Sequence, residues 1–165
     1  MPFPFRTTAA FVALCAAAAA ACSESPLAPD QDLAVTTAGP VRFYAGKSST
    51  ITVTVTNNSA SRTYQIADMH CEDPFTVTTS AGSTFAATFR PCAAIAYPAR
   101  ALPPGESLTL TRDRVGDVGN VGNTGVGTLL SPGTYTVRGF VHVLSSGSAT
   151  TVASNAPLTT EILAR

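Results

Sequence analysis

Apolar and polar residues alternate strictly along residues 50–56, where Ile51, Val53 and Val55 share one face and threonines occupy the other. Alternation with a period of two is typical of a half-buried β-strand, and β-branched residues favour that conformation. The sequence Asn-Asn-Ser at 57–59 supplies turn-forming residues, so the strand is predicted to end there.

The same alternation predicts strands along much of the remaining chain. They cover residues 41–45, 62–70, 75–79, 107–111, 134–144, 152–153 and 158–163. No segment after residue 30 repeats apolar residues at the 3.6-residue period of an amphipathic helix. Short strands separated by Gly, Pro and Asn predict an all-β sandwich.

Two longer stretches interrupt the alternation. Residues 80–101 are too irregular for one strand, and we expect an excursion between strands there. Residues 116–131 carry glycine at every third position from 116 to 125, but without proline this short repeat cannot form a collagen helix, so a flexible loop is predicted. Loops on rigid sandwiches often carry binding sites, and the alternative is a surface insertion without function. The candidate binding residues in this loop are Asp117, Asn120, Asn123 and Leu129.

The longest apolar run, residues 7–21, follows Arg6 at the N-terminus. A run of about 15 residues is short for a membrane-spanning helix and typical of a signal-peptide core, so residues 1–21 are predicted to be a cleaved signal peptide. The sequence Ala-Ala-Ala-Cys at 19–22 resembles a bacterial lipobox. This resemblance implies that Cys22 becomes the first mature residue and carries a lipid anchor to the membrane. The alternative is an ordinary signal peptide followed by an unrelated cysteine.

Residues 22–32 are predicted to form a flexible tether, because they combine prolines and acidic residues with little to bury. The sandwich domain is then expected at residues 33–165. Ser23, directly after the cysteine, is typical of outer-membrane sorting in a bacterium with two membranes. We therefore expect an exported lipoprotein in the periplasm or at the outer membrane.

Charge and cysteine content narrow the picture further. Lys and Arg number 10, Asp and Glu also number 10, and only 12% of the 165 residues are charged, which excludes a basic surface for nucleic acid. Cys71 and Cys92 are expected to pair, because disulfides persist in exported proteins. Closing a loop of about 21 residues would stabilise the fold by roughly 3 kcal/mol. Two free thiols are the alternative.

Three motifs occur in the order ITVTVTNNS at 51–59, LPPGESLTL at 102–110 and SPGTYTVRG at 131–139. Together they resemble the intracellular proteinase inhibitor (BsuPI-like) domain family, over most of residues 40–145. The resemblance implies an immunoglobulin-like antiparallel β-sandwich of about seven to nine strands, and proteinase inhibition as one function. The chain departs from the family in having no tryptophan, a Cys71 and Cys92 pair, and an export signal.

The Pro-Gly dipeptides in two of these motifs are themselves turn signals. Pro104-Gly105 and Pro132-Gly133 each directly precede a predicted strand. Tyr135 follows the second turn at the start of its strand. A buried ring with a hydrogen-bonded hydroxyl is expected to fix the corner there.

Residues 69–73, Met-His-Cys-Glu-Asp, form the densest cluster of metal-ligating residue types. Consecutive strand residues point to opposite faces, so His70 and Cys71 are not expected to converge. His142 is expected on the outward face of its strand, and a disulfide would withdraw Cys71 as a ligand. We therefore predict no metal site.

Sequence signatures of catalysis are lacking. GxSxG, HExxH and CxxC motifs are absent, and Gly46-Lys47-Ser48 lacks the upstream glycine of a phosphate-binding loop. The oxygen-bearing residues around the glycine-rich loop match no calcium loop. We predict neither an enzyme nor a cofactor. The predicted function is a non-catalytic binding or structural module at the cell envelope with a protein or polymer partner, and proteinase inhibition is the alternative.

Overall fold

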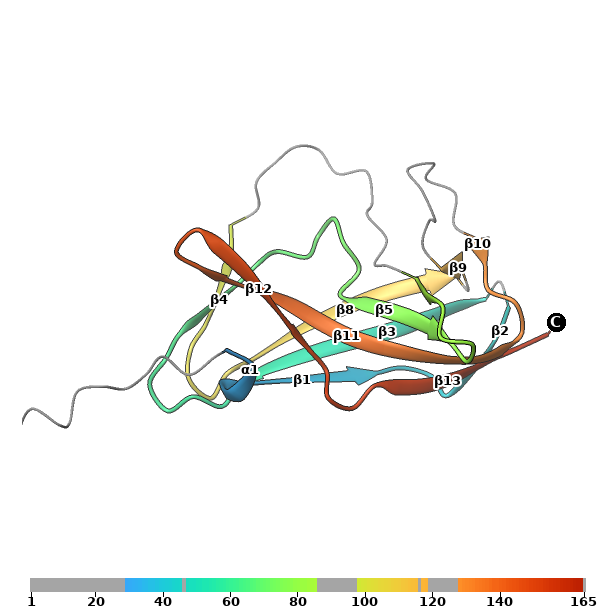
Figure 1. Ribbon diagram of the computed structural model, residues 1–165, viewed down its shortest axis with the longest axis horizontal. Coiled ribbons are helices and arrows are strands. Elements are labelled where there is room, and N and C mark those ends of the chain that lie inside the picture. Colours follow the sequence, from blue (N-terminus) through green and yellow to red (C-terminus); the bar gives the residue numbers. More distant parts are fainter. Residues whose placement is uncertain (1–28, 46, 86–97, 116, 119–127, 165) are drawn as a thin grey trace, which may run out of the picture.

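The computed structural model describes residues 29–45, 47–85, 98–115, 117–118 and 128–164. The predicted signal peptide, Cys22 and most of the predicted tether therefore lie outside the described residues. Within the described residues, strands predominate and the one helix is a single turn (Figure 1), which confirms the predicted all-β fold.

One helical turn and thirteen strands make up the secondary structure of the described residues. In chain order they are α1 Pro29–Asp32, β1 Leu33–Ala38, β2 Arg42–Tyr44, β3 Ser48–Asn57, β4 Tyr64–Ile66, β5 Phe75–Thr79, β6 Thr84–Phe85, β7 Arg100–Leu102, β8 Ser107–Val115, β9 Asp117–Val118, β10 Thr128–Leu129, β11 Gly133–Ser145, β12 Ser148–Ala153 and β13 Leu158–Leu163.

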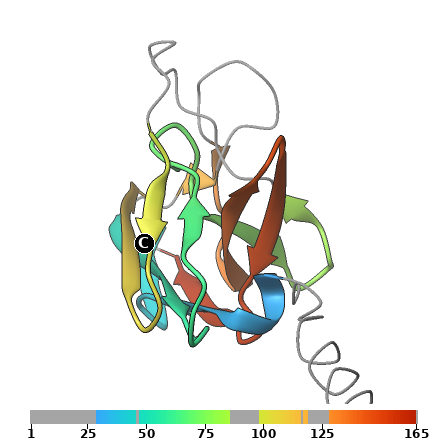
Figure 2. The same cartoon turned by 90° about the vertical axis from the view of Figure 1, so that its left-hand side faces the viewer.

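The strands form a three-stranded sheet, an eight-stranded sheet and a separate pair, β9 with β10. The smaller sheet has the order β1-β3-β8. The larger sheet follows β2-β13-β11-β4-β7, with β12 and β5 also pairing with β11, and β6 pairing with β5. Figure 2 shows β4 and β7, in green and yellow, side by side and antiparallel. Among the described ladders, only β2 with β13 is parallel, so the predicted antiparallel arrangement has one parallel pair at its edge.

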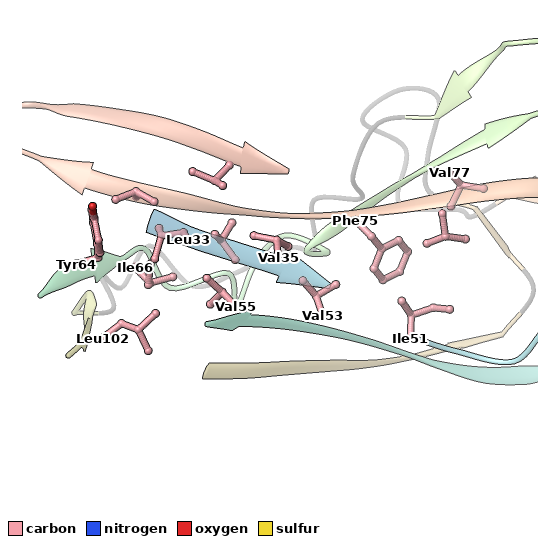
Figure 3. Close-up of a cluster of buried hydrophobic side chains, with 14 of the residues drawn as sticks. Leu33, Val35, Ile51, Val53, Val55, Tyr64, Ile66, Phe75, Val77 and Leu102 are labelled. Atoms are coloured by element: carbon pink, nitrogen blue, oxygen red, sulfur yellow. The ribbon is translucent and has the colours of Figure 1, made fainter. Parts of the chain in front are cut away.

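The hydrophobic core lies between the smaller and the larger sheet. Side chains of β1 and β3 point across the gap toward β11 (Figure 3). The alternation in the sequence assigned these faces correctly, because the apolar residues on the inward faces of β3 and β11 are buried. The buried residues that the alternation predicted are Ile51, Val53, Val55, Tyr135, Val137, Val141 and Val143.

The outer face of the smaller sheet carries hydroxyl side chains, as the alternation also predicts. Thr54 and Thr109 place their Oγ1 atoms 3.3 Å apart across β3 and β8, and the hydroxyls of Thr56 and Ser107 are 2.8 Å apart. Cross-strand hydrogen bonds of this kind stabilise a solvated sheet face without any need for a ligand.

Asn57, at the end of β3, holds three parts of the chain together. Its side chain is fully buried, and its Nδ2 donates to the carbonyls of Arg62 at 2.7 Å and Leu102 at 2.9 Å. Its Oδ1 accepts from the amide of Ser59, and its backbone carbonyl accepts from the amide of Gly105 at 2.8 Å. The motifs at 51–59 and 102–110 therefore meet in space at this asparagine.

Tyr135 fixes the entry to β11 in the way the sequence predicts. Its ring is buried, and its hydroxyl donates a 2.7 Å hydrogen bond to the carbonyl of Ser131, four residues earlier. Burial raises the pKa of Tyr135 above its ordinary value. The Pro104-Gly105 turn also forms, with Gly105 at a φ of 76°, where a side chain would be strained.

The beginning of the domain differs from the prediction. Residues 29–32 form α1, although they were assigned to the tether, and Asp32 accepts a 2.6 Å hydrogen bond from the Tyr64 hydroxyl. The carbonyl of Asp32 accepts from the amide of Asn58 at 2.8 Å. The packed domain therefore includes residues before 33, and β1, which follows directly, was not predicted because its alternation covers few residues.

The strand predicted at 62–70 is limited to β4, Tyr64–Ile66.

Residues 80–101 contain β6 and β7 at their ends, while residues 86–97 lie outside the described residues. Within the loop predicted at 116–131, Asp117–Val118 pairs with Thr128–Leu129, so the described part of this segment has a two-stranded base rather than being structureless. A turn joins β11 to β12, with Ser145 opposite Ser148 and Gly147 at a φ of 84°.

Candidate functional site

The central strand β11 keeps 13 residues extended, but its neighbours on both sides change along its length. On one side β13 pairs with residues 133–137 and β12 with residues 140–145. On the other side β5 pairs with residues 135–139 and β4 with residues 143–144. Both changes of partner fall beside Phe140.

The chain between β4 and β5 leaves the sheet and returns to it within a few residues. The amide of Ala67 donates to the carbonyl of His142, and the amide of Phe140 donates to the carbonyl of Pro74, both at 2.8 Å. Residues 68–73 lie between these two hydrogen bonds and form an excursion. Arg112, on β8 of the opposite sheet, donates from Nη2 to the carbonyl of Met69 at 2.6 Å and so anchors the excursion.

The excursion and β11 together border a hollow on the outer face of the larger sheet. Its floor comes from alternate residues of β11, and its sides come from cross-strand neighbours on β5 and β12. The hollow has a volume of about 350 Å³, at the lower end of the range for small-molecule sites. Its lining residues are Glu72, Thr76, Arg138, Phe140, His142, Thr151 and Ala153.

His142 is held on both sides of its ring. Its Nδ1 lies 2.9 Å from Thr151 Oγ1, and its Nε2 lies 3.3 Å from Glu72 Oε2. Thr151 is directly opposite His142 in the ladder, which explains the short approach of the two side chains. The Phe140 and His142 rings are tilted by 58° with centroids 5.3 Å apart. The imidazole therefore has a fixed orientation at one end of the hollow.

Hydroxyl, imidazole and carboxylate follow one another here, which is the order of groups in nucleophilic triads. A triad also needs hydrogen-bond donors aimed at the developing oxyanion. Arg138 is the cationic side chain of the hollow, but it stands four residues from His142, which is about 13 Å along an extended strand. The hydrogen bonds with Thr151 and Glu72 orient the His142 ring.

The predicted site residues have separate outcomes. Cys71 is disulfide-bonded and stands next to Glu72 in the excursion. Its predicted partner Cys92 lies outside the described residues, so that pairing stays a prediction. In the predicted binding loop, the backbones of Asp117 and Leu129 are opposite each other in the β9–β10 ladder. Asn120, Asn123 and the lipidation site Cys22 lie outside the described residues.

Among the described residues, no three His, Cys, Asp or Glu side chains gather in a way that could hold a metal ion. Cys71, the thiol of the candidate cluster at 69–73, is engaged in its disulfide. In the described ranges, no helix has the length and apolar character needed to cross a membrane.

The hollow was not predicted from the sequence, although the signal was present. Along 134–142 the outward-facing positions are polar except for Phe140, which interrupts the polar phase. In the structure Phe140 is only 7% exposed despite facing away from the core. A large aromatic residue on the polar face of a strand is therefore the feature that indicates this site.

Comparison with known proteins finds structural similarity at low scores. No protein-family model matches the chain, and no curated protein matches it. A β-glucosidase from Listeria innocua in complex with isofagomine is 19% identical with a TM-score of 0.37, over 79% of this chain and 16% of that chain. The Pseudomonas fluorescens alkylpurine DNA glycosylase AlkC, bound to DNA containing an abasic site analog, is 14% identical with a TM-score of 0.40. This similarity covers 79% of this chain and 30% of that chain. The chain spans less than a third of either protein, and at these scores the likeness supports no argument about function.

Proposed function

We propose that this chain is an exported, lipid-anchored and non-catalytic binding module of the cell envelope, built on an immunoglobulin-like sandwich. The observation that carries the binding function is the hollow over Phe140, because it combines an aromatic floor with charged groups on a rigid sheet. Sites that are concave, mostly apolar and bordered by a few oriented polar groups are typical of ligand recognition. The loops near the glycine-rich segment stay a second candidate surface for a protein or polymer partner.

The immunoglobulin-like type is supported by the order of strands. The first strand β1 pairs with β3, which pairs with β8, while the following short strand β2 joins the other sheet beside β13. The strand β11 that follows the β8 connection begins with a buried tyrosine bonded to a carbonyl four residues upstream. A tyrosine corner at that point of the chain is a feature of immunoglobulin-like sandwiches.

A site-specific photo-crosslinker distinguishes binding at the hollow from nonspecific contact. We would place it at Ala153, an exposed residue on the rim, and at Thr109 on the outer face of the opposite sheet as the control. We expect a discrete adduct in the native organism from position 153 and none from position 109. Equal adducts from both positions, or none from 153, would contradict binding at the hollow.

Export and anchoring need an independent test, because Cys22 lies outside the described residues. Mass spectrometry of the mature protein is expected to find a lipid-modified Cys22 as its first residue. The Cys22→Ala variant is expected to leave the membrane fraction. An unmodified Cys22, or cleavage at another position, would overturn the lipid anchor and leave the binding function to be judged by the crosslinking.

The absence of catalysis is also testable at the hollow. We expect the protein to hydrolyse p-nitrophenyl esters no faster than buffer does, because Arg138, the cationic side chain of the hollow, stands about 13 Å along the strand from His142. Hydrolysis that disappears in both His142→Gln and Thr151→Val would show that Thr151, His142 and Glu72 work as a nucleophilic triad and would refute the non-catalytic assignment.

Proteinase inhibition is the second candidate function. It is favoured by the resemblance of three motifs to an inhibitor family, two of which contact each other through Asn57. The test is a panel of serine proteases assayed with micromolar protein. Stoichiometric inhibition would support this candidate, and unchanged activity of every protease would exclude it for that class.

A further inference from the structure

The two ends of the hollow differ in what they leave available to a ligand. At one end both nitrogens of the His142 ring have partners, Thr151 and Glu72. At the other end Arg138 is exposed, and within the part of the chain that the structure describes its guanidinium makes no hydrogen bond or ion pair. The charge that the hollow presents without a partner is therefore the positive charge of Arg138.

The floor between these ends is apolar. Phe140 lies between Arg138 and His142 on the same face of β11, and Ala153 is its cross-strand neighbour. A ligand bound at Arg138 would thus extend over Phe140 toward His142. The span from residue 138 to residue 142 is about 13 Å in an extended strand, which fits a small molecule rather than a polymer segment of many units.

The carboxylate of Glu72 determines the direction in which an anionic ligand can bind. Glu72 faces the hollow at the His142 end and carries negative charge there. Like charges repel, so an anionic group is disfavoured at that end and favoured beside Arg138. A guanidinium binds a carboxylate through two parallel hydrogen bonds, and an aromatic floor favours an apolar body.

We propose that the hollow binds a small organic carboxylate with an apolar body, its carboxylate on Arg138 and its apolar part over Phe140. This inference rests on the proposed binding function and names the chemistry of its ligand. A free inorganic anion could pair with the guanidinium of Arg138 but would make no contact with the Phe140 ring. The apolar body of the ligand is therefore part of the recognition.

The test uses the full chain, 3-phenylpropanoate as the probe and the neutral 3-phenylpropanamide as its matched control. Amide chemical shifts of β11 and β12 are expected to move in a saturable way with 3-phenylpropanoate. The amide is expected to bind about tenfold more weakly or worse, because it cannot form the charge-assisted pair. Inorganic phosphate is expected to cause no shifts around Phe140.

Variants complete the test. Arg138→Gln is expected to lower the affinity for 3-phenylpropanoate about tenfold, while Arg100→Gln, at an exposed position of β7, is expected to leave it unchanged. Equal affinity of the amide, an unchanged affinity of Arg138→Gln, or shifts confined to other surfaces would overturn the carboxylate assignment. If the carboxylate assignment is overturned while the crosslinker at position 153 still forms an adduct in cells, only the ligand chemistry is refuted. Loss of both results would refute the binding function as well.

Discussion

The amide of Gly139 in β11 donates a 2.8 Å hydrogen bond to the side-chain oxygen of Thr37 in β1, which joins the two sheets directly. A Cβ at Gly139 would lie 2.6 Å from that oxygen and 2.8 Å from Val53 Cγ2. The absence of a side chain therefore permits the close approach of β11 to the smaller sheet. This contact lies one residue from the floor of the hollow.

Gly139→Ala is accordingly expected to lower the free energy of unfolding by about 1–3 kcal/mol, since the added methyl group overpacks a tight contact. Denaturant unfolding followed by circular dichroism measures the change. Ser146→Ala in the exposed β11–β12 turn serves as the control and is expected to change the stability by less than about 0.5 kcal/mol. Equal stability of Gly139→Ala and the parent would show that the sheets can separate at no cost.

Asn57→Ala is expected to destabilise the domain by about 2–4 kcal/mol, because it leaves the carbonyls of Arg62 and Leu102 and the amide of Ser59 without a partner. The matched control is Asn58→Ala, since the side chain of Asn58 is exposed and its amide bond to Asp32 does not depend on the side chain. Thermal unfolding of both variants compares them. A larger effect at Asn58 would contradict the role of Asn57 as the junction of the two motifs.

Tyr135→Phe removes the hydrogen bond to Ser131 and is expected to cost about 1 kcal/mol at neutral pH. Burial raises the pKa of Tyr135 in the folded state, so the unfolded chain loses this proton first as the pH rises. The corresponding stability is fully present below about pH 10 and declines as the pH rises through the folded-state pKa. The variant is expected to lose less stability above pH 10 than the parent does.

Urea midpoints measured from pH 7 to pH 11 test this expectation. Burial also raises the pKa of Tyr64, followed by its hydrogen bond to Asp32, so part of the alkaline loss is expected to persist in Tyr135→Phe. Tyr44→Phe, whose side chain is 54% exposed, is the control and is expected to leave the neutral-pH stability unchanged. A variant with the same alkaline loss as the parent would exclude a contribution from Tyr135.

Peptide mapping without reduction is expected to find Cys71 linked to Cys92. Reduction is then expected to lower the free energy of unfolding by roughly 3 kcal/mol, through loss of the loop constraint. Because Cys71 precedes Glu72, the chemical shifts of His142 are expected to respond as well. The Cys71→Ser, Cys92→Ser double variant should be insensitive to reductant, and a different partner for Cys71 would refute the pairing.

The alternation of side chains was sufficient to predict most strands of the fold. β5 and β13 begin and end at the predicted residues, because each is a short run with apolar and β-branched residues. β3, β8 and β11 extend the predicted runs by one or more residues. In these segments the burial of one face favours the strand conformation. The apolar residues of the sequence show which face that is.

The hollow depends on relationships that alternation does not contain. Glu72 reaches His142 because the chain leaves the sheet after Ile66 and returns at Phe75, so the two residues, 70 positions apart, become neighbours. Residues 67–70 carry no turn dipeptide, and the predicted strand therefore includes them. Pairing between distant segments, which single-strand patterns do not specify, creates the site.

The changes of partner strand on both sides of β11 affect how the length of the chain can vary between related domains. Residues 68–73 and 154–157 connect strands that each keep their own register on β11. Both connections lie outside these ladders, so their length can change without a change of register in any ladder. Relatives with the same scaffold can therefore reshape the border of the cavity through changes in length alone, and specificity can diversify without a new framework.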